Sequence, residues 1–168
     1  MTSLTYLAIN ENQLSSTIPK ELGTLAQLFA FDVSTNNMTG PIPSELEGLI
    51  KLFSLDLYDN QLSSTIPTEL GNLDQLSHFA VYTNIMTGPI PSEFGKLTSL
   101  TYLAVNENKL TSTIPTELGN LAQLVSFCAY IKLRQLSKIS ELCRDCTVDV
   151  VVIDREYCQP CKLPKLRR

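Results

Sequence analysis

A block of fifteen residues occurs three times in this chain with only a few changes. It reads LSSTIPKELGTLAQL at 14–28, LSSTIPTELGNLDQL at 62–76 and LTSTIPTELGNLAQL at 110–124, so successive copies begin 48 residues apart. Two related blocks, MTGPIPSELEGLIKL and MTGPIPSEFGKLTSL, lie midway between them and reduce the period to 24. A fixed period of roughly 20–50 residues is the signature of a solenoid, in which each repeat forms one coil. We therefore predict two parts: residues 1–123, with five repeats at 4–27, 28–51, 52–75, 76–99 and 100–123, and residues 124–168, with a degenerate sixth repeat and a C-terminal cap.

Each predicted coil has the same internal order. Its opening LxxLxV alternates as a short strand with one buried face does. Pro115 and Gly119 of the fifth coil bracket a turn that is too short for a long helix. A single coil cannot bury its apolar side alone, whereas stacked coils can, and each buried aliphatic side chain contributes about 1.5–3 kcal/mol. The predicted core positions of the fifth coil are Leu100, Leu103, Val105, Leu110, Ile114, Leu118 and Leu121.

An asparagine recurs where each predicted strand ends and the chain turns inward. Its carboxamide both donates and accepts hydrogen bonds, so stacked asparagines can bond the backbone of their own coil and of the next one. Such bonds would satisfy backbone groups that the turn leaves buried. We interpret this column as a structural ladder made of Asn12, Asn36, Asn60, Asn84 and Asn108.

The repeats LFSLDLYDNQLSSTIPTELGNL (52–73) and LSHFAVYTNIMTGPIPSEFGKL (76–97) resemble the plant-type, 24-residue leucine-rich repeat family, with its signature LxxLxxLxLxxNxLxGxIPxxLGxL. The resemblance implies an α/β solenoid: a right-handed superhelix with a concave parallel β-sheet, a short second strand and a cysteine-containing C-terminal cap. Members include receptor-kinase ectodomains, polygalacturonase-inhibiting proteins and algal leucine-rich repeat proteins. Most bind protein, peptide or glycan ligands, which is what we expect of this chain. The sequence departs from the signature where Ser16, Ser64 and Ser112 replace the glycine that Gly40 and Gly88 retain.

The outward positions of the predicted strands would line the concave face. Aromatic side chains at such positions often anchor interfaces, and clustered aspartates suit a partner with basic or hydroxyl-rich chemistry. The alternative is that the aromatic side chains only pack against one another across neighbouring coils. The candidate ligand-binding residues are Tyr6, Phe29, Asp32, Phe53, Asp56, Tyr58, Asp59, His78, Tyr82 and Tyr102.

The C-terminal part departs from the repeat. LVSFCAY (124–130) and TVDVVVID (147–154) are typical of strands, and IKLRQLSKISEL (131–142) has the spacing of an amphipathic helix. The motifs CRDC and CQPC could close a zinc site, or they could form two disulfides. The family resemblance favours disulfides and an extracellular or cell-surface location. The candidate disulfide cysteines are Cys143, Cys146, Cys158 and Cys161, with Cys128 left over on an outward strand position.

Charge and composition exclude several classes of protein. Residues 1–123 hold twelve acidic and four basic residues, a net charge of −8, which argues against nucleic acid as the main partner. Residues 124–168 hold nine basic and five acidic residues, a net charge of +4. With 43% hydrophobic residues, disorder is not expected, and no apolar run is long enough to span a bilayer. The start MTSLTYLAIN does not resemble a signal peptide and begins partway into a repeat, so we expect a piece of a longer protein.

Three functions remain open, and none is catalytic. His78 is the only histidine, no nucleophile or phosphate-loop motif accompanies it, and we predict no cofactor and no metal. The leading hypothesis is recognition of a protein, peptide or glycan on the concave face. The second is a structural subunit of a larger assembly, because an uncapped first coil would expose an apolar end. The third is ice binding by a hydroxyl ladder made of Ser15, Thr39, Ser63, Thr87 and Thr111.

One N-glycosylation triplet, Asn37–Met38–Thr39, is present, and it is relevant only if the protein is secreted.

Overall fold

The structure is a computed structural model that describes residues 3–111, 114–130 and 149–153. The four cysteines of the predicted cap and the predicted helix at 131–142 lie outside these residues.

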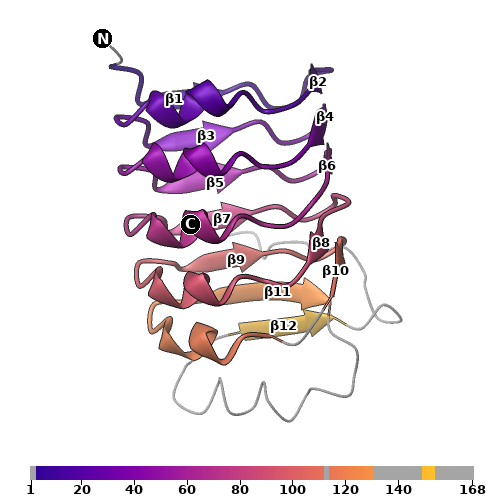
Figure 1. Cartoon of the computed structure of the whole chain (residues 1–168). Coiled ribbons are helices and arrows are strands. Elements are labelled where there is room, and N and C mark those ends of the chain that lie inside the picture. Colours follow the sequence, from indigo (N-terminus) through magenta and orange to yellow (C-terminus); the bar gives the residue numbers. More distant parts are fainter. Residues whose placement is uncertain (1–2, 112–113, 131–148, 154–168) are drawn as a thin grey trace, which may run out of the picture.

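The coils stack so that the first strand of each one joins a single sheet, called the main sheet below (Figure 1). All neighbouring strands in it are parallel, and pairs such as Tyr6↔Ala30 and His78↔Tyr102 join residues one repeat apart. The two strands predicted after residue 123 are both present and extend this sheet, so that prediction is confirmed. The strand order is β1 (Tyr6–Ala8), β3 (Ala30–Asp32), β5 (Ser54–Asp56), β7 (His78–Ala80), β9 (Tyr102–Ala104), β11 (Ser126–Tyr130) and β12 (Asp149–Ile153).

A second strand of two to four residues follows in each of the five repeats, and these strands form two small parallel sheets, called the side sheets below. One side sheet has the order β2-β4-β6 and the other pairs β10 with β8. Thr65↔Thr87 is an isolated bridge between them. The strands are β2 (Ser15–Ser16), β4 (Asn37–Gly40), β6 (Gln61–Leu62), β8 (Thr87–Gly88) and β10 (Lys109–Leu110).

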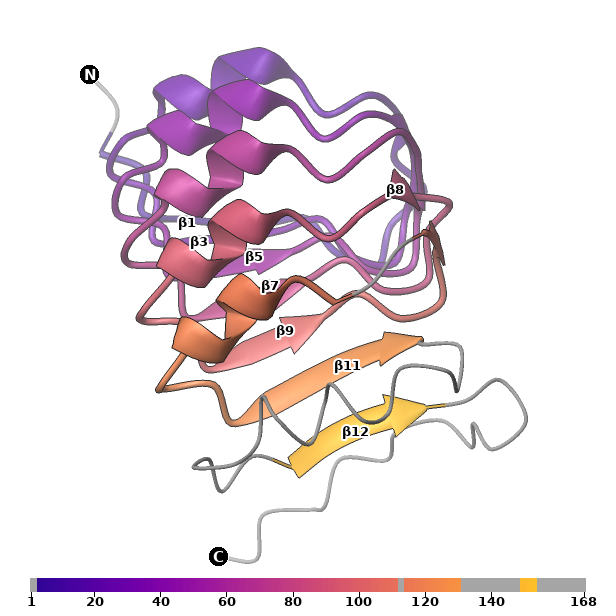
Figure 2. The same cartoon turned by 60° about the horizontal axis from the view of Figure 1, so that its bottom comes forward.

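Each coil returns through a five-residue 3₁₀ helix on the side of the stack away from the main sheet (Figure 2). A proline precedes every one of these helices, with φ between −58° and −65°. Proline supplies a preset φ for the turn, and five residues are too few for a stable α-helix. The helices are η1 (Lys20–Thr24), η2 (Ser44–Gly48), η3 (Thr68–Asn72), η4 (Ser92–Lys96) and η5 (Thr116–Asn120).

The space enclosed by these elements is filled by the repeated leucines, isoleucines and phenylalanines. Leu55, Leu70 and Phe79 are fully buried, and the Phe79 and Phe94 rings pack edge to face at 5.4 Å. The predicted leucine-rich repeat solenoid with a parallel sheet is therefore confirmed.

The asparagine column lies between the main sheet and the side sheets. The Asn84 carboxamide is buried, donates to the carbonyls of Leu57, Val81 and Tyr82, and accepts from the Leu62 amide at 2.8 Å. Asn12 in the first coil is exposed and donates only to two carbonyls of its own coil. One carboxamide thus joins three stretches of backbone in an inner coil, but only one in the first coil.

The backbone keeps a positive φ at the turn where serine alternates with glycine. Gly40 and Gly88 have φ of +75° and +73°, and Ser64 has φ of +71°. A Cβ atom added to Gly88 would lie 2.7 Å from the Thr65 Cγ2 atom. Ser64 therefore adopts a left-handed conformation that glycine tolerates more easily, because its Cβ crowds the backbone there.

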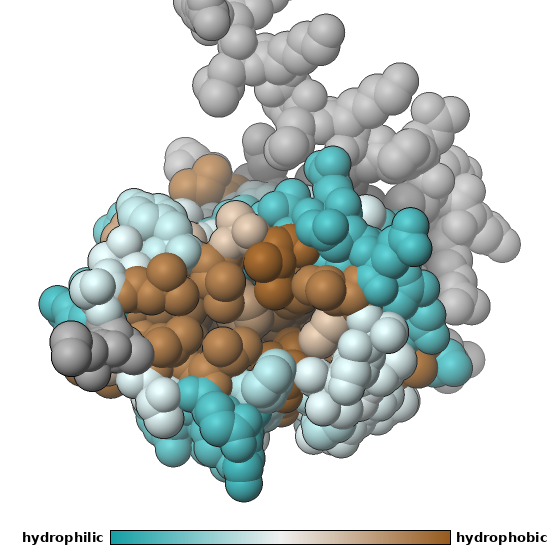
Figure 3. Space-filling view, turned by 90° about the horizontal axis from the view of Figure 1, so that it is seen from above, coloured by the Kyte–Doolittle hydropathy of each residue, from teal (hydrophilic) through white to brown (hydrophobic). Residues whose placement is uncertain are grey.

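The first coil leaves the N-terminal end of the core uncovered, and Figure 3 looks onto this apolar surface. Leu4 and Leu14 are 43% and 40% exposed. Leu7, Ile9 and Leu25 of the same coil are only partly buried.

Candidate functional site

The outward face of the main sheet, called the main-sheet face below, carries the ten residues that the sequence suggests for ligand binding. Strand alternation separates them from the core: Leu55 is fully buried, whereas its neighbours Ser54 and Asp56 are half-buried on the other side. Tyr6 at the N-terminal end of the face is 63% exposed. The remaining candidates are exposed (Phe29, Phe53 and Asp59) or half-buried (Asp32, Asp56, Tyr58, His78, Tyr82 and Tyr102).

The aromatic rings of this face stack across neighbouring coils. Tyr58 and Tyr82 are 4.5 Å apart between ring centroids and 5° from parallel. The imidazole of His78 lies 4.3 Å from the Tyr102 ring, at 2°. A third stack joins Phe29 and Phe53 at 5.0 Å and 5°, and Tyr6 contacts Phe29 at a tilt of 54°. The aromatic candidates therefore form three stacks on the face.

The small residues Ala80, Ala104 and Cys128 form the floor beneath the tyrosines. All three are buried, at 1%, 1% and 7% exposed, and Tyr58, Tyr82 and Tyr102 pack against them. Small side chains let the broad tyrosine rings lie close to the sheet. Cys128 does lie on an outward strand position, as predicted from the sequence, but these contacts bury it.

The pKa of the Tyr82 hydroxyl is raised well above its ordinary value. The largest cause is burial, followed by the nearby Tyr58 and Tyr102 hydroxyls and the carboxylates of Asp56 and Asp59. All these effects disfavour a further negative charge at this point. Burial disfavours charge of either sign here, and the Asp56 and Asp59 carboxylates add a negative potential to the middle of the main-sheet face.

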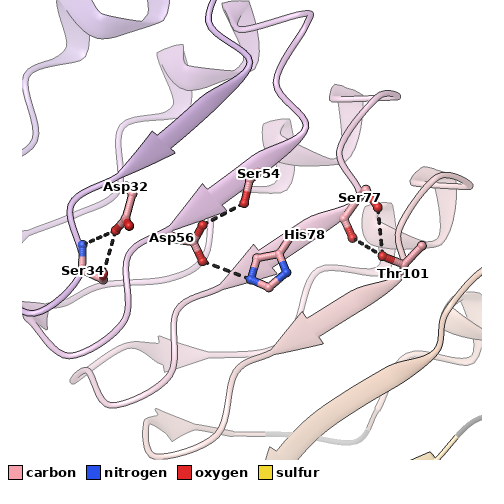
Figure 4. Close-up of polar contacts among 7 residues, drawn as sticks. All are labelled: Asp32, Ser34, Ser54, Asp56, Ser77, His78 and Thr101. Carbon is pink, nitrogen blue, oxygen red and sulfur yellow. Dashed lines mark hydrogen bonds and ion pairs between the residues drawn. The ribbon is translucent and has the colours of Figure 1, made fainter. Parts of the chain in front are cut away.

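Hydrogen bonds fix two of the three candidate aspartates of the face, Asp56 and Asp32 (Figure 4). The His78 Nε2 atom lies 3.0 Å from Asp56 Oδ1, and the Ser54 hydroxyl donates to Asp56 Oδ2 at 2.8 Å. Asp32 on the preceding strand accepts from the Ser34 amide and hydroxyl, at 2.9 and 2.6 Å. Bonded on both sides, the carboxylate of Asp56 is held rigidly beside the imidazole.

Four polar residues next to the candidates were not singled out by the sequence analysis. Ser34 and Ser54 each lie two positions from an aspartate on the same strand face, and this S-x-D or D-x-S spacing is the signal that could have identified them. Ser77 and Thr101 stack on neighbouring coils, with their hydroxyl oxygens 2.9 Å apart. They occupy the positions that Phe29 and Phe53 hold in the second and third coils.

A rim of left-handed residues borders the main-sheet face. In five successive coils the residue before the ladder asparagine has φ between +51° and +54°, although none is glycine. The same strained turn recurs in every coil, so it belongs to the architecture and not to one site. These rim residues are Glu11, Thr35, Asp59, Thr83 and Glu107.

Within the described ranges, no three His, Cys, Asp or Glu side chains are grouped so that they could hold a metal ion. In the same ranges, none of the helices has the length and apolar character that crossing a membrane requires.

Comparisons with known proteins agree with this geometry. The Leucine Rich Repeat family model matches residues 3–25, 51–73 and 99–121. Among curated proteins, no match was found.

Solved structures similar to this chain include plant receptor kinases. The ectodomain of the receptor kinase GASSHO1/SCHENGEN3 from Arabidopsis thaliana, in complex with CASPARIAN STRIP INTEGRITY FACTOR 2, is 39% identical over 74% of this chain, with a TM-score of 0.71. The Arabidopsis receptor kinase HAESA, with the peptide hormone IDA and the co-receptor SERK1, is 34% identical over 87%, with a TM-score of 0.75. A chain of the Arabidopsis BIR3–SERK2 complex is 34% identical over 68%, with a TM-score of 0.66. The chain spans 15%, 25% and 62% of those three proteins.

Proposed function

Because the chain belongs to the leucine-rich repeat family, we propose that it is a non-catalytic recognition module whose main-sheet face binds a polypeptide outside the cell or at its surface. The observation that carries this proposal is the set of three aromatic stacks beside a fixed Asp56–His78 pair. Two of the similar receptor structures contain a bound partner, the peptide hormone IDA or CASPARIAN STRIP INTEGRITY FACTOR 2, and they support recognition as the general function.

The stacking geometry favours a polypeptide over a glycan. A sugar ring packs best on the open face of an aromatic ring, and here each of six rings has one face covered by its stacking partner. The ring edges and the tyrosine hydroxyls suit carbonyl oxygens and aliphatic side chains. A stacked, half-buried ring also loses little conformational entropy on binding.

The charge of the face suggests the chemistry of the ligand. Asp59 is exposed on the rim, Asp56 and Asp32 lie on the strands, and the surroundings of Tyr82 disfavour negative charge. A peptide with basic or hydroxyl side chains would be attracted to such a surface, and acidic peptides would be repelled.

A selection experiment tests this proposal. A random peptide library would be selected on the immobilised chain, and each selected peptide measured against the Tyr58→Ala/Tyr82→Ala variant and a side-sheet control, Thr87→Ala. Loss of an aromatic anchor costs about 2 kcal/mol or more, which corresponds to roughly thirtyfold weaker binding. We expect that loss for the tyrosine variant and none for the control. Equal binding to all three proteins would place the binding surface elsewhere.

The exposed N-terminal end supports a second candidate, a structural subunit of a larger assembly. Leu4 and Leu14 leave apolar side chains in solvent at the end of the core. Light scattering after size exclusion would compare the chain with a Leu4→Lys/Leu14→Lys variant, and with Ile50→Lys as a control at another exposed apolar residue. Association that only the first variant abolishes would support assembly through this end, and a clean monomer for the unaltered chain would count against it.

A further inference from the structure

The triplet Asn37–Met38–Thr39 is the only Asn-x-Ser/Thr sequence in the 168 residues, and it lies within β4 of a side sheet. We propose that Asn37 is the acceptor of an N-linked glycan, which covers the hydroxyl ladder and leaves the main-sheet face open. Glycosylation at Asn37 does not depend on the recognition function proposed above, but only on entry into a secretory pathway.

Two adjacent asparagines, Asn36 just before β4 and Asn37 at its first position, differ in what their carboxamides do. Asn36 belongs to the ladder: its amide nitrogen donates to the carbonyls of Ile9, Val33 and Ser34, and its oxygen accepts from the Leu14 amide. Asn37 is exposed, and its carboxamide makes no hydrogen bond to any described residue. Asn36 is therefore committed to the fold, whereas the nitrogen of Asn37 remains accessible.

The alternation of β4 places the whole triplet correctly for modification. Met38 is 7% exposed and points into the core, so Asn37 and Thr39 point to the outside together. Their neighbours in the sheet, Ser15 opposite Asn37 and Gln61 opposite Thr39, are exposed polar residues. A first sugar on Asn37 would thus meet small or flexible polar side chains and no packed core.

The fold does not require asparagine at this position. The equivalent residues of the other coils differ from one another in size, polarity and charge. They are Gln13, Gln61, Ile85 and Lys109.

The modification is a glycosyl transfer without change of oxidation state. The Nδ2 atom of Asn37 forms a bond to the anomeric carbon of an oligosaccharide carried on a lipid diphosphate. The bond from that carbon to the diphosphate oxygen breaks, one amide proton is lost to solvent, and the lipid diphosphate leaves. The hydroxyl of Thr39 completes the triplet that the transferase of the secretory pathway recognises.

The glycan and the hydroxyl ladder would occupy the same surface. Thr39 belongs both to the triplet and to the ladder, and Ser15 faces Asn37 across the strand pair. Figure 1 shows β4 at one side of the stack, away from β3 and β5 of the main sheet. A glycan here would prevent the flat contact that ice binding needs, while a ligand could still reach the main-sheet face.

The test is expression of the full chain behind a cleavable leader in a eukaryotic secretory host, followed by mass spectrometry. We expect the secreted protein to carry one N-glycan at Asn37, which an amide-cleaving glycosidase removes and leaves aspartate. Asn37→Gln and Thr39→Val would lack the glycan, and the matched variant Thr39→Ser would keep it. A folded, secreted wild-type chain with unmodified Asn37 would overturn the proposal.

His78 provides a probe for the open face, because it is the only histidine. Its rate of reaction with diethyl pyrocarbonate should be the same in the glycosylated chain and in the Asn37→Gln variant. A rate several-fold lower in the glycosylated chain would show that the glycan also covers the main-sheet face, contrary to the proposal.

Discussion

The main-sheet face and the side sheets come from the same repeat, but they differ in which outward positions vary. At the third strand position of the main sheet the five coils carry Tyr6, Ala30, Ser54, His78 and Tyr102, whereas every ladder position of the side sheets carries serine or threonine. The side sheets join closely approaching turns, since a Cβ atom added to Gly40 would lie 2.7 Å from the Thr17 Cγ2 atom. The side sheets vary too, at the position that holds Gln13, Asn37, Gln61, Ile85 and Lys109, so what sets them apart is the adjoining hydroxyl column, which the main-sheet face lacks.

The largest expected effect concerns the asparagine that joins the two regions. Asn84→Ala should lower the free energy of unfolding by about 3 kcal/mol, because it leaves the buried Leu62 amide without a partner and removes one of the two carboxamide donors to the Leu57 and Val81 carbonyls. Asn12→Ala should cost less than about 1 kcal/mol, because water replaces the two bonds of this exposed side chain. Urea denaturation measures both, and equal losses would mean that the ladder does not connect the sheets.

The next effect tests the side sheets. Gly88→Ala should destabilise by about 2 kcal/mol, because a Cβ at φ +73° is strained and meets the Thr65 methyl group. In a Thr65→Ser background the methyl group that the new Cβ would meet is absent. Gly88→Ala should therefore destabilise the chain less there, and only the backbone strain at the positive φ should remain. If Gly88→Ala had the same midpoint of thermal unfolding as the unaltered chain, this account of the turn would be contradicted.

The reverse substitution should give a smaller gain. Ser64→Gly relieves a left-handed serine, at φ +71°, and should stabilise by about 0.5–1 kcal/mol after the entropy of glycine in the unfolded chain is included. The same urea denaturation measures it. A loss of stability would show that the serine side chain makes a compensating contact.

The smallest effect concerns the main-sheet face. Tyr82→Phe should change stability by less than about 0.5 kcal/mol at neutral pH. The folded chain raises the pKa of Tyr82 above its ordinary value of 10.0, so the unfolded chain releases this proton first, and stability falls as the pH rises above 10.0. The Tyr82→Phe variant should lack the loss of stability that ionisation of Tyr82 causes above pH 10.0. Denaturation of both proteins at neutral and alkaline pH measures the difference, and parallel curves would contradict the assigned surroundings of Tyr82.

Much of the fold was predictable because the same apolar, proline and asparagine positions recur every 24 residues. The strand at LVSFCAY, the strand at TVDVVVID and the parallel sheet follow from alternation and period, and all three predictions are confirmed. The sequence also predicted a turn too short for a long helix. The described turns are 3₁₀ helices, since the proline before each one and its five-residue length leave no room for an α-helix.

The candidate site was predictable only as a set of outward positions. Alternation puts Asp56 and His78 on one face, but the sequence does not contain the 3.0 Å contact between them or the bond from Ser54 to Asp56. Those depend on the register between coils and on side-chain rotamers, which no single repeat specifies. Whether the ten candidate residues bind a ligand stays a prediction.

The period, the buried columns and the outward positions follow from the order of the residues alone, because stacking identical coils leaves one way to bury the leucines. The three-dimensional packing was needed to see which ring stacks on which, that Cys128 is covered and that Asn37 is accessible while Asn36 is not. The hydrogen bonds and ring stacks between coils join residues 22–27 positions apart. These contacts form only when neighbouring coils have packed together.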